Sequence, residues 1–438
     1  MDITSNTSKS YLLKLAIPIF FSNIAIPFAG LVDTGLMGHL NNVKFLAAIS
    51  VATSVMTMIL WSFGFLRMGM VGLVAQALGR KDYDEIIIVF IRNLILATFI
   101  GLMLIFFKEP IILLTEHFFK TTAETQNLIN KYISIRILSA PAELLIYVLV
   151  GLYLGMQRTY VSSIMISTFC FGNVILSIIF VIHFNLEIFG VAAGTVIAAY
   201  TTVTIFLIFT YFQLKNKFRT TLSYKKIFNL TKILKLLNIN FDIFIRTILL
   251  TFSFLWVTYQ GAKLGENYLA INALLMQFIL FASFFLDSYA FSTEAVIGYT
   301  IGRRAKKNFL KVVSNSFQLS IFSSFIISLI YLFTFRHIVN ELTDLDYLRF
   351  LIFDYIIWIL IIPPVASICY QFDGIFIGAS QTAEMRNGMI ISVILFISSS
   401  HFLVNNFGNH GLWLSLLFFM IMRSITLNYY FNRILKKL

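Results

Sequence analysis

Apolar runs of roughly 20 residues or more recur about twelve times along this chain. An α-helix of that length crosses the hydrocarbon core of a bilayer, where every backbone polar group must be satisfied within the segment. The chain has 438 residues, of which 59% are hydrophobic and only 12% are charged, whereas soluble domains are closer to a quarter charged. Long unbroken runs also favour helices over the alternating strands of a barrel. We therefore predict an all-α integral membrane protein.

Twelve transmembrane helices are predicted from these runs, with boundaries placed to within a few residues. The second, eighth and tenth exceed a straight span, so we expect them to tilt or to protrude from the bilayer. The predicted spans are 11–38, 46–78, 85–107, 130–153, 158–183, 187–213, 239–262, 268–300, 310–335, 348–378, 385–404 and 409–432.

The basic residues decide the predicted orientation of the chain. The net charge is +13, and Lys and Arg gather between spans and at the C-terminus. The longest polar connection, residues 214–238, carries seven of them, namely Lys215, Lys217, Arg219, Lys225, Lys226, Lys232 and Lys235. Because positively charged loops remain in the cytoplasm, we expect this loop and both termini to be cytoplasmic in the cell (inner) membrane. The pattern favours membrane orientation over nucleic-acid binding, and the first run is too long for a cleavable signal.

The two halves of the chain share positions of glycine and proline. An offset of 223 residues superimposes Gly38 on Gly261, Leu46-Ala47 on Leu269-Ala270, Gly79-Arg80 on Gly302-Arg303, Pro141 on Pro364, Gly151 on Gly374 and Gly155 on Gly378. About one such coincidence is expected by chance from the composition. Since the offset equals six spans and keeps the orientation, we predict two parallel-repeat six-helix lobes, 1–213 and 239–438, joined by a cytoplasmic linker at 214–238.

Asp33 stands inside the first predicted span. A carboxylate that faces lipid costs about 2.5–3.5 kcal/mol on insertion scales, so an acid at this depth generally faces protein or trapped water and marks an ion or substrate path. The alternative is an aspartate near the end of the helix that reaches water, although residues 35–38 continue the span beyond it. Pro18 and Pro27 weaken the hydrogen-bond ladder of the same helix and permit a hinge.

Three uncharged polar residues of the first half can accompany Asp33. Asn173 and Ser177 are four residues apart on the fifth span and share a face, and Thr195 follows a stretch of small residues on the sixth, where two helices can approach closely. Carboxylate, amide and hydroxyl oxygens together suit a proton or a hard cation such as Na⁺. Ordinary interhelical hydrogen bonding is an equally good interpretation of these three side chains.

The second half carries further charges within its spans. Asp287 and Glu294 are two turns apart on one face of the eighth span, and Asp373 lies in the tenth. With Arg246 they form a candidate second site, whose alternative interpretation is a structural ion pair between Arg246 and Asp287. Asp242 lies close to a helix start, where we expect it to be solvated.

No pattern typical of an enzyme is present in the sequence. The histidines fall at helix ends or in loops, and none forms a His-x-x-x-His pair. The phosphate-binding pattern G-x-x-x-x-G-K-[ST] does not occur, which argues against ATP-driven transport. Cys170 and Cys369 lie within apolar runs and imply no disulfide framework. We expect no catalytic residues, no cofactor and no metal, apart from a coupling ion.

Several motifs, in order along nearly the whole chain, resemble those of the MATE (multidrug and toxic compound extrusion) transporters, most closely their DinF-like branch. These motifs are Leu15-Ala16-Ile17-Pro18, Gly30-Leu31-Val32-Asp33-Thr34, Gly38-His39-Leu40, Leu66-Arg67-Met68-Gly69, Gly72-Leu73-Val74-Ala75-Gln76-Ala77-Leu78-Gly79, Asp287-Ser288-Tyr289-Ala290-Phe291 with Glu294-Ala295, Asp373-Gly374-Ile375-Phe376-Ile377-Gly378-Ala379 and Met385-Arg386-Asn387.

The resemblance implies a cation-coupled antiporter in which Asp33 is the coupling site and the first helix bends at Pro18 when Asp33 is protonated. In the family, an asparagine and an aspartate four residues apart on the fifth helix support that acid. Here these positions hold Asn173 and Ser177, so one carboxylate is missing. Because hard cations require charge and several oxygens, we expect H⁺ as the coupling ion, with Na⁺ at Asp33 and Asn173 as the alternative.

The predicted function is secondary-active multidrug efflux, in which a monomer exchanges amphipathic or cationic compounds for H⁺ by alternating access. A lipid-linked precursor flippase of the same superfamily is the main alternative. It would require a basic central cavity, and Arg67 and Arg246 are the only clear intramembrane arginines that the sequence pattern predicts. A channel or a non-transporting scaffold is the third hypothesis.

Overall fold

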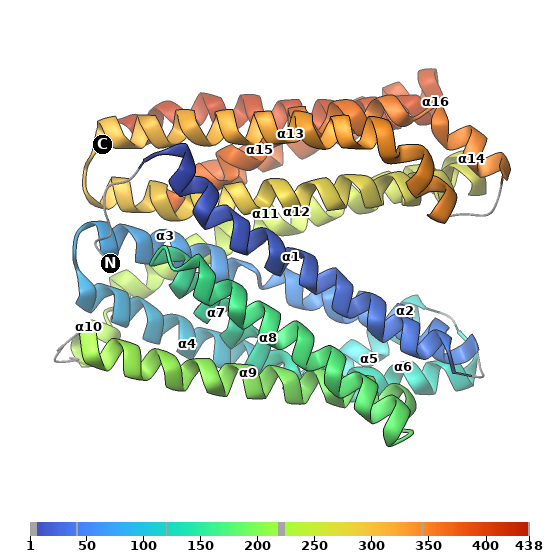
Figure 1. Cartoon of the computed structure of the whole chain (residues 1–438), viewed down its shortest axis with the longest axis horizontal. Helices are drawn as coiled ribbons and strands as arrows, with labels where there is room; N and C mark the ends of the chain where they lie inside the picture. The colour runs from blue at the N-terminus through green and yellow to red at the C-terminus, as the bar shows by residue number, and fades with distance from the viewer. Residues whose placement is uncertain (1–6, 41–42, 120, 218–223, 343–345, 437–438) are drawn as a thin grey trace. The chain divides into compact units, whose positions relative to one another are not determined.

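In a computed structural model of the chain, residues 7–40, 43–119, 121–217, 224–342 and 346–436 are described, and their regular secondary structure is helical throughout (Figure 1). Within these ranges, 11 helical segments are long and apolar enough to cross a membrane. The longest, α16 (Thr382–Leu435), is interrupted at Gly408, whose φ of 56° is not helical, so it comprises two helices. Once α16 is divided, the segments correspond to the predicted spans.

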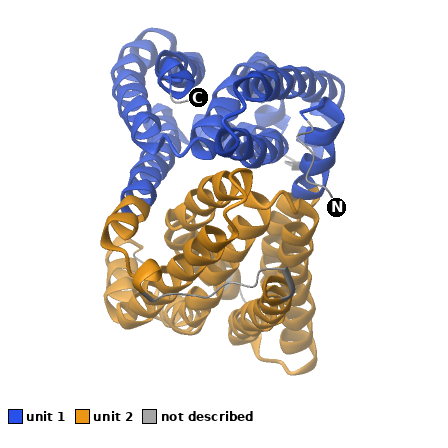
Figure 2. Cartoon of the chain, turned by 90° about the vertical axis from the view of Figure 1, so that its left-hand side faces the viewer, with its two compact units in different colours: residues 1–20, 237–438 blue, residues 21–236 orange. Residues whose placement is uncertain are grey.

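The chain divides into two compact units, which Figure 2 distinguishes by colour. Unit 2 comprises Phe21–Leu236, and unit 1 comprises Met1–Phe20 together with Leu237–Leu438. The division falls within the first helix, so that α1 contributes its first part to unit 1 and its second part to unit 2.

The helices of the first half begin and end within a few residues of the predicted spans, except that the fourth span begins seven residues early, with α6, and contains a 3₁₀-helix. They are α1 (Lys9–Gly38), α2 (Val43–Ser62), α3 (Phe65–Gly79), α4 (Tyr83–Phe106), α5 (Lys108–Phe118), α6 (Ala123–Arg136), the 3₁₀-helix η1 (Ile137–Ser139), α7 (Ala140–Gly155), α8 (Thr159–Ile178), the π-helix η2 (Ile179–His183), α9 (Glu187–Lys217) and α10 (Tyr224–Ile227). Those of the second half are α11 (Leu230–Leu264), α12 (Glu266–Gly302), α13 (Lys306–Leu342), α14 (Asp346–Phe353), α15 (Ile356–Gly378) and α16.

Other features of the helices also differ from the predicted spans. The second predicted span consists of α2 and α3, which are separated at Phe63 and Gly64. The tenth begins as α14 and is interrupted before α15. The helix α5 was not predicted, because its charged first residues, Lys108 and Glu109, are typical of a loop. It is a short amphipathic helix that buries Ile112.

Glycines at equivalent positions of the repeat bring two helices into close contact in each unit. In unit 2, a Cβ atom on Gly151 of α7 would lie 2.7 Å from the carbonyl oxygen of Arg67 in α3. In unit 1, a Cβ atom on Gly374 of α15 would lie 2.5 Å from the carbonyl oxygen of Ala290 in α12. Arg67 and Ala290 are also separated by the repeat offset of 223 residues. The glycine and the helix against which it packs therefore recur together.

The next turn repeats this arrangement. A Cβ atom on Gly155 would lie 2.9 Å from the carbonyl oxygen of Val71, and one on Gly378 would lie 2.5 Å from that of Glu294. These two carbonyl groups are again one repeat offset apart. The structure thus confirms the internal repeat on which the prediction of two parallel halves depends.

Two prolines, Pro363 and Pro364, lie inside α15. Proline has no N–H group, so the carbonyl group four residues earlier loses its helical donor. For Pro364 that carbonyl belongs to Leu360, and the Ser328 hydroxyl group of α13 donates to it at 2.8 Å. A polar side chain of a neighbouring helix thus satisfies a group that has no access to water in a bilayer.

The connection between the halves is more helical than the loop predicted at 214–238, because α9 extends into it and α11 begins within it. Arg92 of α4 is buried and donates through Nε to the carbonyl oxygen of Ile227, at 2.8 Å, at the end of α10. Lys232, in the first turn of α11, donates to Glu85 at 2.6 Å. This part of the connection is therefore anchored to α4.

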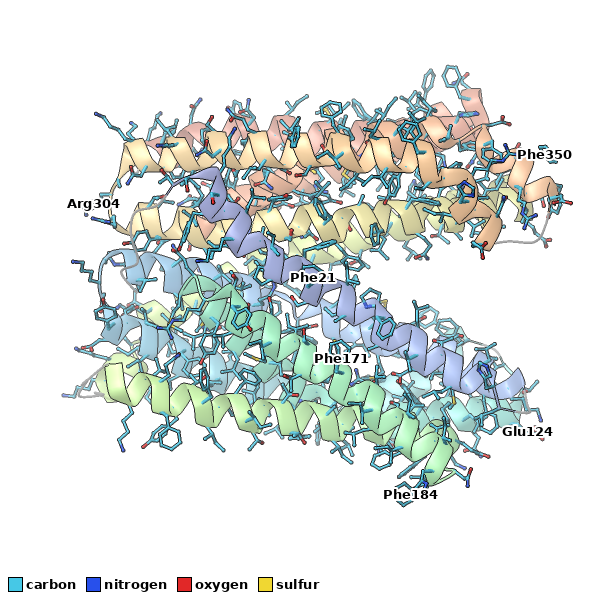
Figure 3. All side chains as sticks on the ribbon, viewed as in Figure 1. Phe21, Glu124, Phe171, Phe184, Arg304 and Phe350 are labelled. Carbon is cyan, nitrogen blue, oxygen red and sulfur yellow. The ribbon has the colours of Figure 1, made fainter. Side chains whose placement is uncertain are left out.

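Large apolar side chains cover the outside of the helices (Figure 3). Phe21, Phe171 and Phe350 are 66%, 54% and 76% exposed, respectively. A soluble protein rarely exposes aromatic side chains in such numbers, whereas a lipid-facing surface is expected to be apolar. The surface therefore agrees with the composition in indicating a multi-pass membrane protein.

Candidate functional site

Asp33 lies on the buried stripe of α1. Along that helix Ala25, Ala29, Asp33 and Met37 recur at four-residue intervals, and each of them is buried. The two alanines pack against Cys170 of α8, which brings α1 close to that helix. Asp33 is 7% exposed. Its carboxyl group therefore faces the interior of unit 2.

The polar side chains of α8 approach this carboxyl group. Ser177 and Asn173 both interact with Asp33, while Ser177 donates to Asn173 Oδ1 at 3.5 Å. Asn173 Nδ2 donates to Thr195 Oγ1 of α9 at 2.5 Å, and Gly194 permits this approach, since its Cβ atom would lie 2.9 Å from the Ser177 nitrogen. The structure thus brings the four predicted residues together, and the interhelical hydrogen bond expected as the alternative is also present.

A buried ion pair that the sequence analysis missed lies beside Asp33. Arg136 ends α6 and donates to both carboxylate oxygens of Glu143, in the first turn of α7. Ser139 donates to Glu143 at 2.6 Å, and the charge of Arg136 acts on Asp33. One signal could have revealed the pair, namely opposite charges seven residues apart within an apolar run, since seven residues are about two helical turns.

The charges of this site determine which ligand it can bind. Asp33, Arg136 and Glu143, when all are ionised, carry one net negative charge. Asp33 Oδ1 is buried and has no hydrogen-bond partner among the described residues. A buried charge without a partner is costly, so it favours neutralisation. The arrangement can therefore bind one proton or one monovalent cation.

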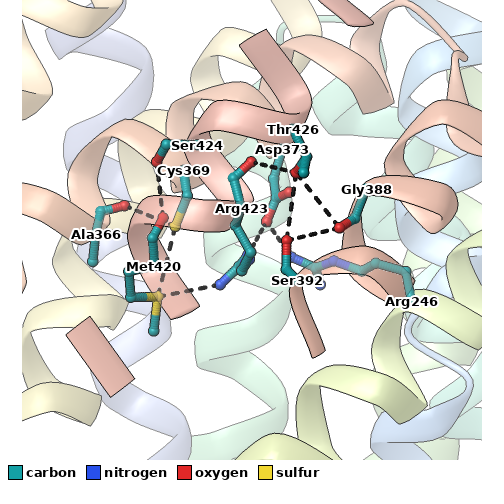
Figure 4. A network of polar contacts seen from close by, with 10 residues as sticks. All are labelled: Arg246, Ala366, Cys369, Asp373, Gly388, Ser392, Met420, Arg423, Ser424 and Thr426. Carbon is teal, nitrogen blue, oxygen red and sulfur yellow. Dashed lines mark hydrogen bonds and ion pairs between the residues drawn. The ribbon is translucent and has the colours of Figure 1, made fainter. Parts of the chain in front are cut away.

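A second polar cluster lies in unit 1, where Asp373 of α15 is held between two arginines (Figure 4). Its Oδ2 accepts hydrogen bonds from Arg246 of α11 and, at 2.6 Å, from Arg423 of α16. Each of the three side chains is 8% exposed or less. Arg246 of α11 therefore forms an ion pair with Asp373 of α15, which spacing along one helix does not reveal.

Arg423 was not among the intramembrane arginines expected from the sequence, although it lies in the middle of the twelfth predicted span. Its presence changes the chemistry expected at Asp373. Two guanidinium groups already share that carboxylate, so Asp373 supplies no excess negative charge for a cation.

The remaining predicted residues of the second half lie on α12 and α11. Glu294 is 1% exposed, and the charge of Asp287 acts on Tyr370 of α15. Asp242 is buried and accepts hydrogen bonds from Thr382 and Arg386. The expectation that Asp242 is solvated at a helix start is therefore wrong, because α11 begins well before it.

The proposed hinge residues lie in an uninterrupted helix. α1 is helical from Lys9 to Gly38 and passes through both Pro18 and Pro27. Among the described residues, no group of three or more His, Cys, Asp or Glu side chains is placed to hold a metal ion.

Comparison with known sequences gives the family of the chain. The family model MatE matches residues 18–179 and 243–405, one match in each half, as the internal repeat predicts. DNA damage-inducible protein F of Escherichia coli K12 is 34% identical over 421 residues, which cover 96% of this chain and 91% of that protein. The multidrug export protein MepA of Staphylococcus aureus MSSA476 is 23% identical, over 88% of this chain and 84% of that protein.

Solved structures share the fold at lower identity. A multidrug resistance MATE transporter of the MOP superfamily, in an outward-facing conformation, has a TM-score of 0.88 and 16% identity and covers 98% of this chain and 96% of its own. A mutant of the Vibrio cholerae MATE transporter VcmN has a TM-score of 0.86 and 18% identity and covers 98% and 97%. The chain thus belongs to the MATE family, most closely to its DinF-like branch, and is a multi-pass membrane transporter rather than an enzyme.

Proposed function

We propose that this transporter exports neutral or cationic amphipathic compounds in exchange for protons, and that Asp33 binds the coupling proton. The similarity to multidrug export proteins supports the class of substrate. The chain offers many side chains suited to such compounds, since it contains 47 Phe and 14 Met residues. Aromatic faces and thioethers adapt to varied apolar shapes and attract cations.

The observation that carries the proposal is the charge of the site in unit 2. A buried aspartate lies beside an ion pair that leaves one negative charge in excess, and its Oδ1 atom is open to a new bond. One proton on Asp33 makes the cluster neutral. A proton taken up there changes the charge of α1 itself, and this couples ion binding to the conformation of that helix.

The hydroxyl and amide groups around Asp33 favour a proton over Na⁺. A hard cation requires several oxygen ligands at once, but Thr195 already accepts from Asn173 and donates to its own helix at 3.0 Å. Asn173 Oδ1 accepts from Ser177. Coordination of Na⁺ would disrupt these bonds, whereas protonation of Asp33 leaves them in place.

In the proposed cycle, the transporter is a monomer in the cell (inner) membrane with both termini in the cytoplasm. Substrate enters from the cytoplasm or the inner leaflet, a proton from outside reaches Asp33, and substrate is released outwards. Coupling requires that substrate and proton favour different states of the carrier. The two lobes, 1–213 and 239–438, and a hinge at Pro18 and Pro27 are part of this proposal.

Reconstituted vesicles test the proposal directly. Purified protein in proteoliposomes should transport ethidium when a pH gradient is imposed, and Asp33→Asn should abolish that transport while the protein still inserts. Asp354→Asn is the matched control, because it makes the same chemical change at an exposed acid between α14 and α15, outside the helical segments that are long and apolar enough to cross a membrane. Ethidium transport by Asp33→Asn at the wild-type rate would exclude Asp33, and transport driven by a Na⁺ gradient alone would refute the choice of ion.

The alternative of a lipid-linked precursor flippase requires unpaired basic side chains to hold a pyrophosphate. Arg246 and Arg423 are both engaged by Asp373, and Arg136 is engaged by Glu143. These pairs reduce the positive charge available to such a ligand. A substrate-dependent proton flux in the same vesicles would support the antiporter over the flippase and over a channel.

A further inference from the structure

The buried pair of Arg136 and Glu143 does not itself take up the proton in the cycle proposed above, yet it is costly in free energy. Their side chains are only 13% and 10% exposed. Removal of two charges from water costs several kcal/mol per ion, and an apolar pair of similar volume is often as stable or more so. Stability alone therefore accounts poorly for this pair in an apolar unit.

The pair is placed where its charge reaches the proposed proton site. The charge of Arg136 acts on Asp33, although no hydrogen bond joins the two side chains among the described residues. The guanidinium group donates to Glu143 through both terminal nitrogens and to Ser139 through one of them. Arginine carries five donors in a planar fork and can serve two carboxylates.

We propose that Arg136 is a positioning residue for Asp33. While Asp33 is protonated, the guanidinium group of Arg136 stays with Glu143. When the proton leaves, the guanidinium group moves towards the carboxylate of Asp33. This inference rests on the proposed function. The open Oδ1 atom of Asp33 is the acceptor that a deprotonated carboxylate presents. A buried, charged oxygen atom without a hydrogen-bond partner is costly, so the deprotonated carboxylate attracts the nearest cation.

The chain is built to allow such a turn at this point. Arg136 is the last residue of α6, and the chain continues as the 3₁₀-helix η1 before α7 begins. A short 3₁₀ stretch within a longer helix often marks a hinge, because its hydrogen bonds are poorer than those of an α-helix. The hydroxyl group of Ser139 keeps a hydrogen bond on Glu143, at 2.6 Å, that does not depend on Arg136.

Other titratable groups around the site also contribute to its charge and must be held constant in a test. From α6, Tyr132 lies within reach of Asp33, Arg136 and Glu143. From α7, Tyr147 faces Glu143 and lies in the field of Arg67 in α3. On α8, Cys170 lies in the electrostatic field of Glu143, whereas Asn173 and Ser177 carry no charge. The charged partner of Asp33 that can be exchanged without alteration of α1 is therefore Arg136, and Glu143 can be exchanged as the counter-charge of Arg136.

Charge counting gives a test that a structural role of the pair would not satisfy. Arg136→Gln leaves two acids without a base, so protonation becomes easier and the pH of half-protonation of Asp33 should rise by about one unit or more. Glu143→Gln makes Asp33 the one remaining acid near Arg136 among the described residues, so the pH of half-protonation of Asp33 should fall by a similar amount. The double variant restores the original net charge, and its midpoint should return close to the wild-type value.

The midpoint can be measured on the full-length protein in detergent by infrared titration of the protonated carboxyl band. Subtraction of the Asp33→Asn spectrum from the wild-type spectrum isolates the signal of Asp33. Arg136→Lys keeps the positive charge, so the midpoint of Asp33 in that variant should stay near the wild-type value. Opposite shifts in the two single variants support the inference. Shifts in the same direction, or midpoints unchanged in both, would overturn it.

Two further outcomes separate this inference from the proposed function. If the difference spectrum contains no titrating carboxyl group, the proton site itself is wrong. If Asp33 titrates but ignores Arg136 and Glu143, only the positioning role fails. Should Arg136→Gln not fold, Glu143→Gln must still lower the midpoint, and an unchanged midpoint there refutes the inference by itself.

Discussion

Replacement of Gly374 by alanine should destabilise unit 1 through a single added methyl group. The new Cβ atom would lie 2.5 Å from the carbonyl oxygen of Ala290 and 3.2 Å from its Cα atom. Carbon–oxygen contacts are comfortable at about 3.3–3.6 Å, so α15 and α12 must separate locally by about 0.8 Å or more. The obstacle is backbone, which cannot rotate away as a side chain would.

The expected magnitude follows from two opposing effects. Overpacking of a close-packed contact costs about 1–3 kcal/mol, and alanine regains up to about 1 kcal/mol through its higher helix propensity. The net loss for Gly374→Ala therefore lies between about 0 and 3 kcal/mol, with about 1–2 kcal/mol at the centre of that range. In a unit of this size that corresponds to a fall in Tm of roughly 2–8 °C.

Thermal unfolding of the purified protein in detergent, at a fixed scan rate, measures this loss. Gly30→Ala is the matched control, because nothing lies within 4 Å of its added Cβ atom and only helix propensity acts. Gly151→Ala should lower Tm as well, since its added Cβ atom meets the Arg67 carbonyl oxygen at 2.7 Å. A Gly374→Ala protein that unfolds together with the Gly30→Ala control would refute the close approach of α15 and α12.

Two further predictions concern the charged clusters. Asp373→Asn should destabilise the protein by about 3–5 kcal/mol, because Arg246 and Arg423 would lose their common counter-charge in a buried site; a Tm equal to that of the wild type would show that the arginines find other partners. Ser177→Asp adds a carboxylate beside Asp33 and should make ethidium efflux in proteoliposomes respond to Na⁺, since a hard cation gains charge and an oxygen ligand; an unchanged response to Na⁺ would contradict the assignment of the site.

The helices and their repeat could be predicted from the sequence because both depend on features of short stretches of the chain. A bilayer demands long apolar runs, so the spans follow from hydropathy alone. Where two helix backbones lie very close, only glycine leaves enough room, because a Cβ atom would collide with the facing helix. If the same contact occurs in both halves of the chain, a glycine occurs at the same position in both. Gly151 and Gly374 therefore share an offset in sequence and an equivalent carbonyl contact in space.

The partners of the charged residues could not be predicted in the same way. Which acid pairs with Arg246 depends on how several helices are rotated about their axes. The sequence shows which residues share a face of one helix, but it does not show which face of a neighbouring helix lies opposite. The sequence suggested an ion pair of Arg246 with Asp287, and the structure shows one between Arg246 and Asp373. Arg136 and Arg423 were missed for a different reason. Each lies within a run that stays long and strongly apolar despite the charge, so hydropathy alone does not single it out.

The repeat reproduces the scaffold but not the charges, and this difference bears on where the ion binds. At the offset of 223 residues, Asp33 corresponds to Trp256 and Arg136 to Ile359, while Asp373 corresponds to Val150. The two units are thus similar in backbone and different in chemistry. In the first, a buried acid is in excess and can accept a proton, whereas in the second the acid at Asp373 is shared by two arginines. Because a shared fold leaves these side chains free to differ, it is the residues, and not the architecture, on which our proposal of proton coupling in the unit that holds Asp33 depends.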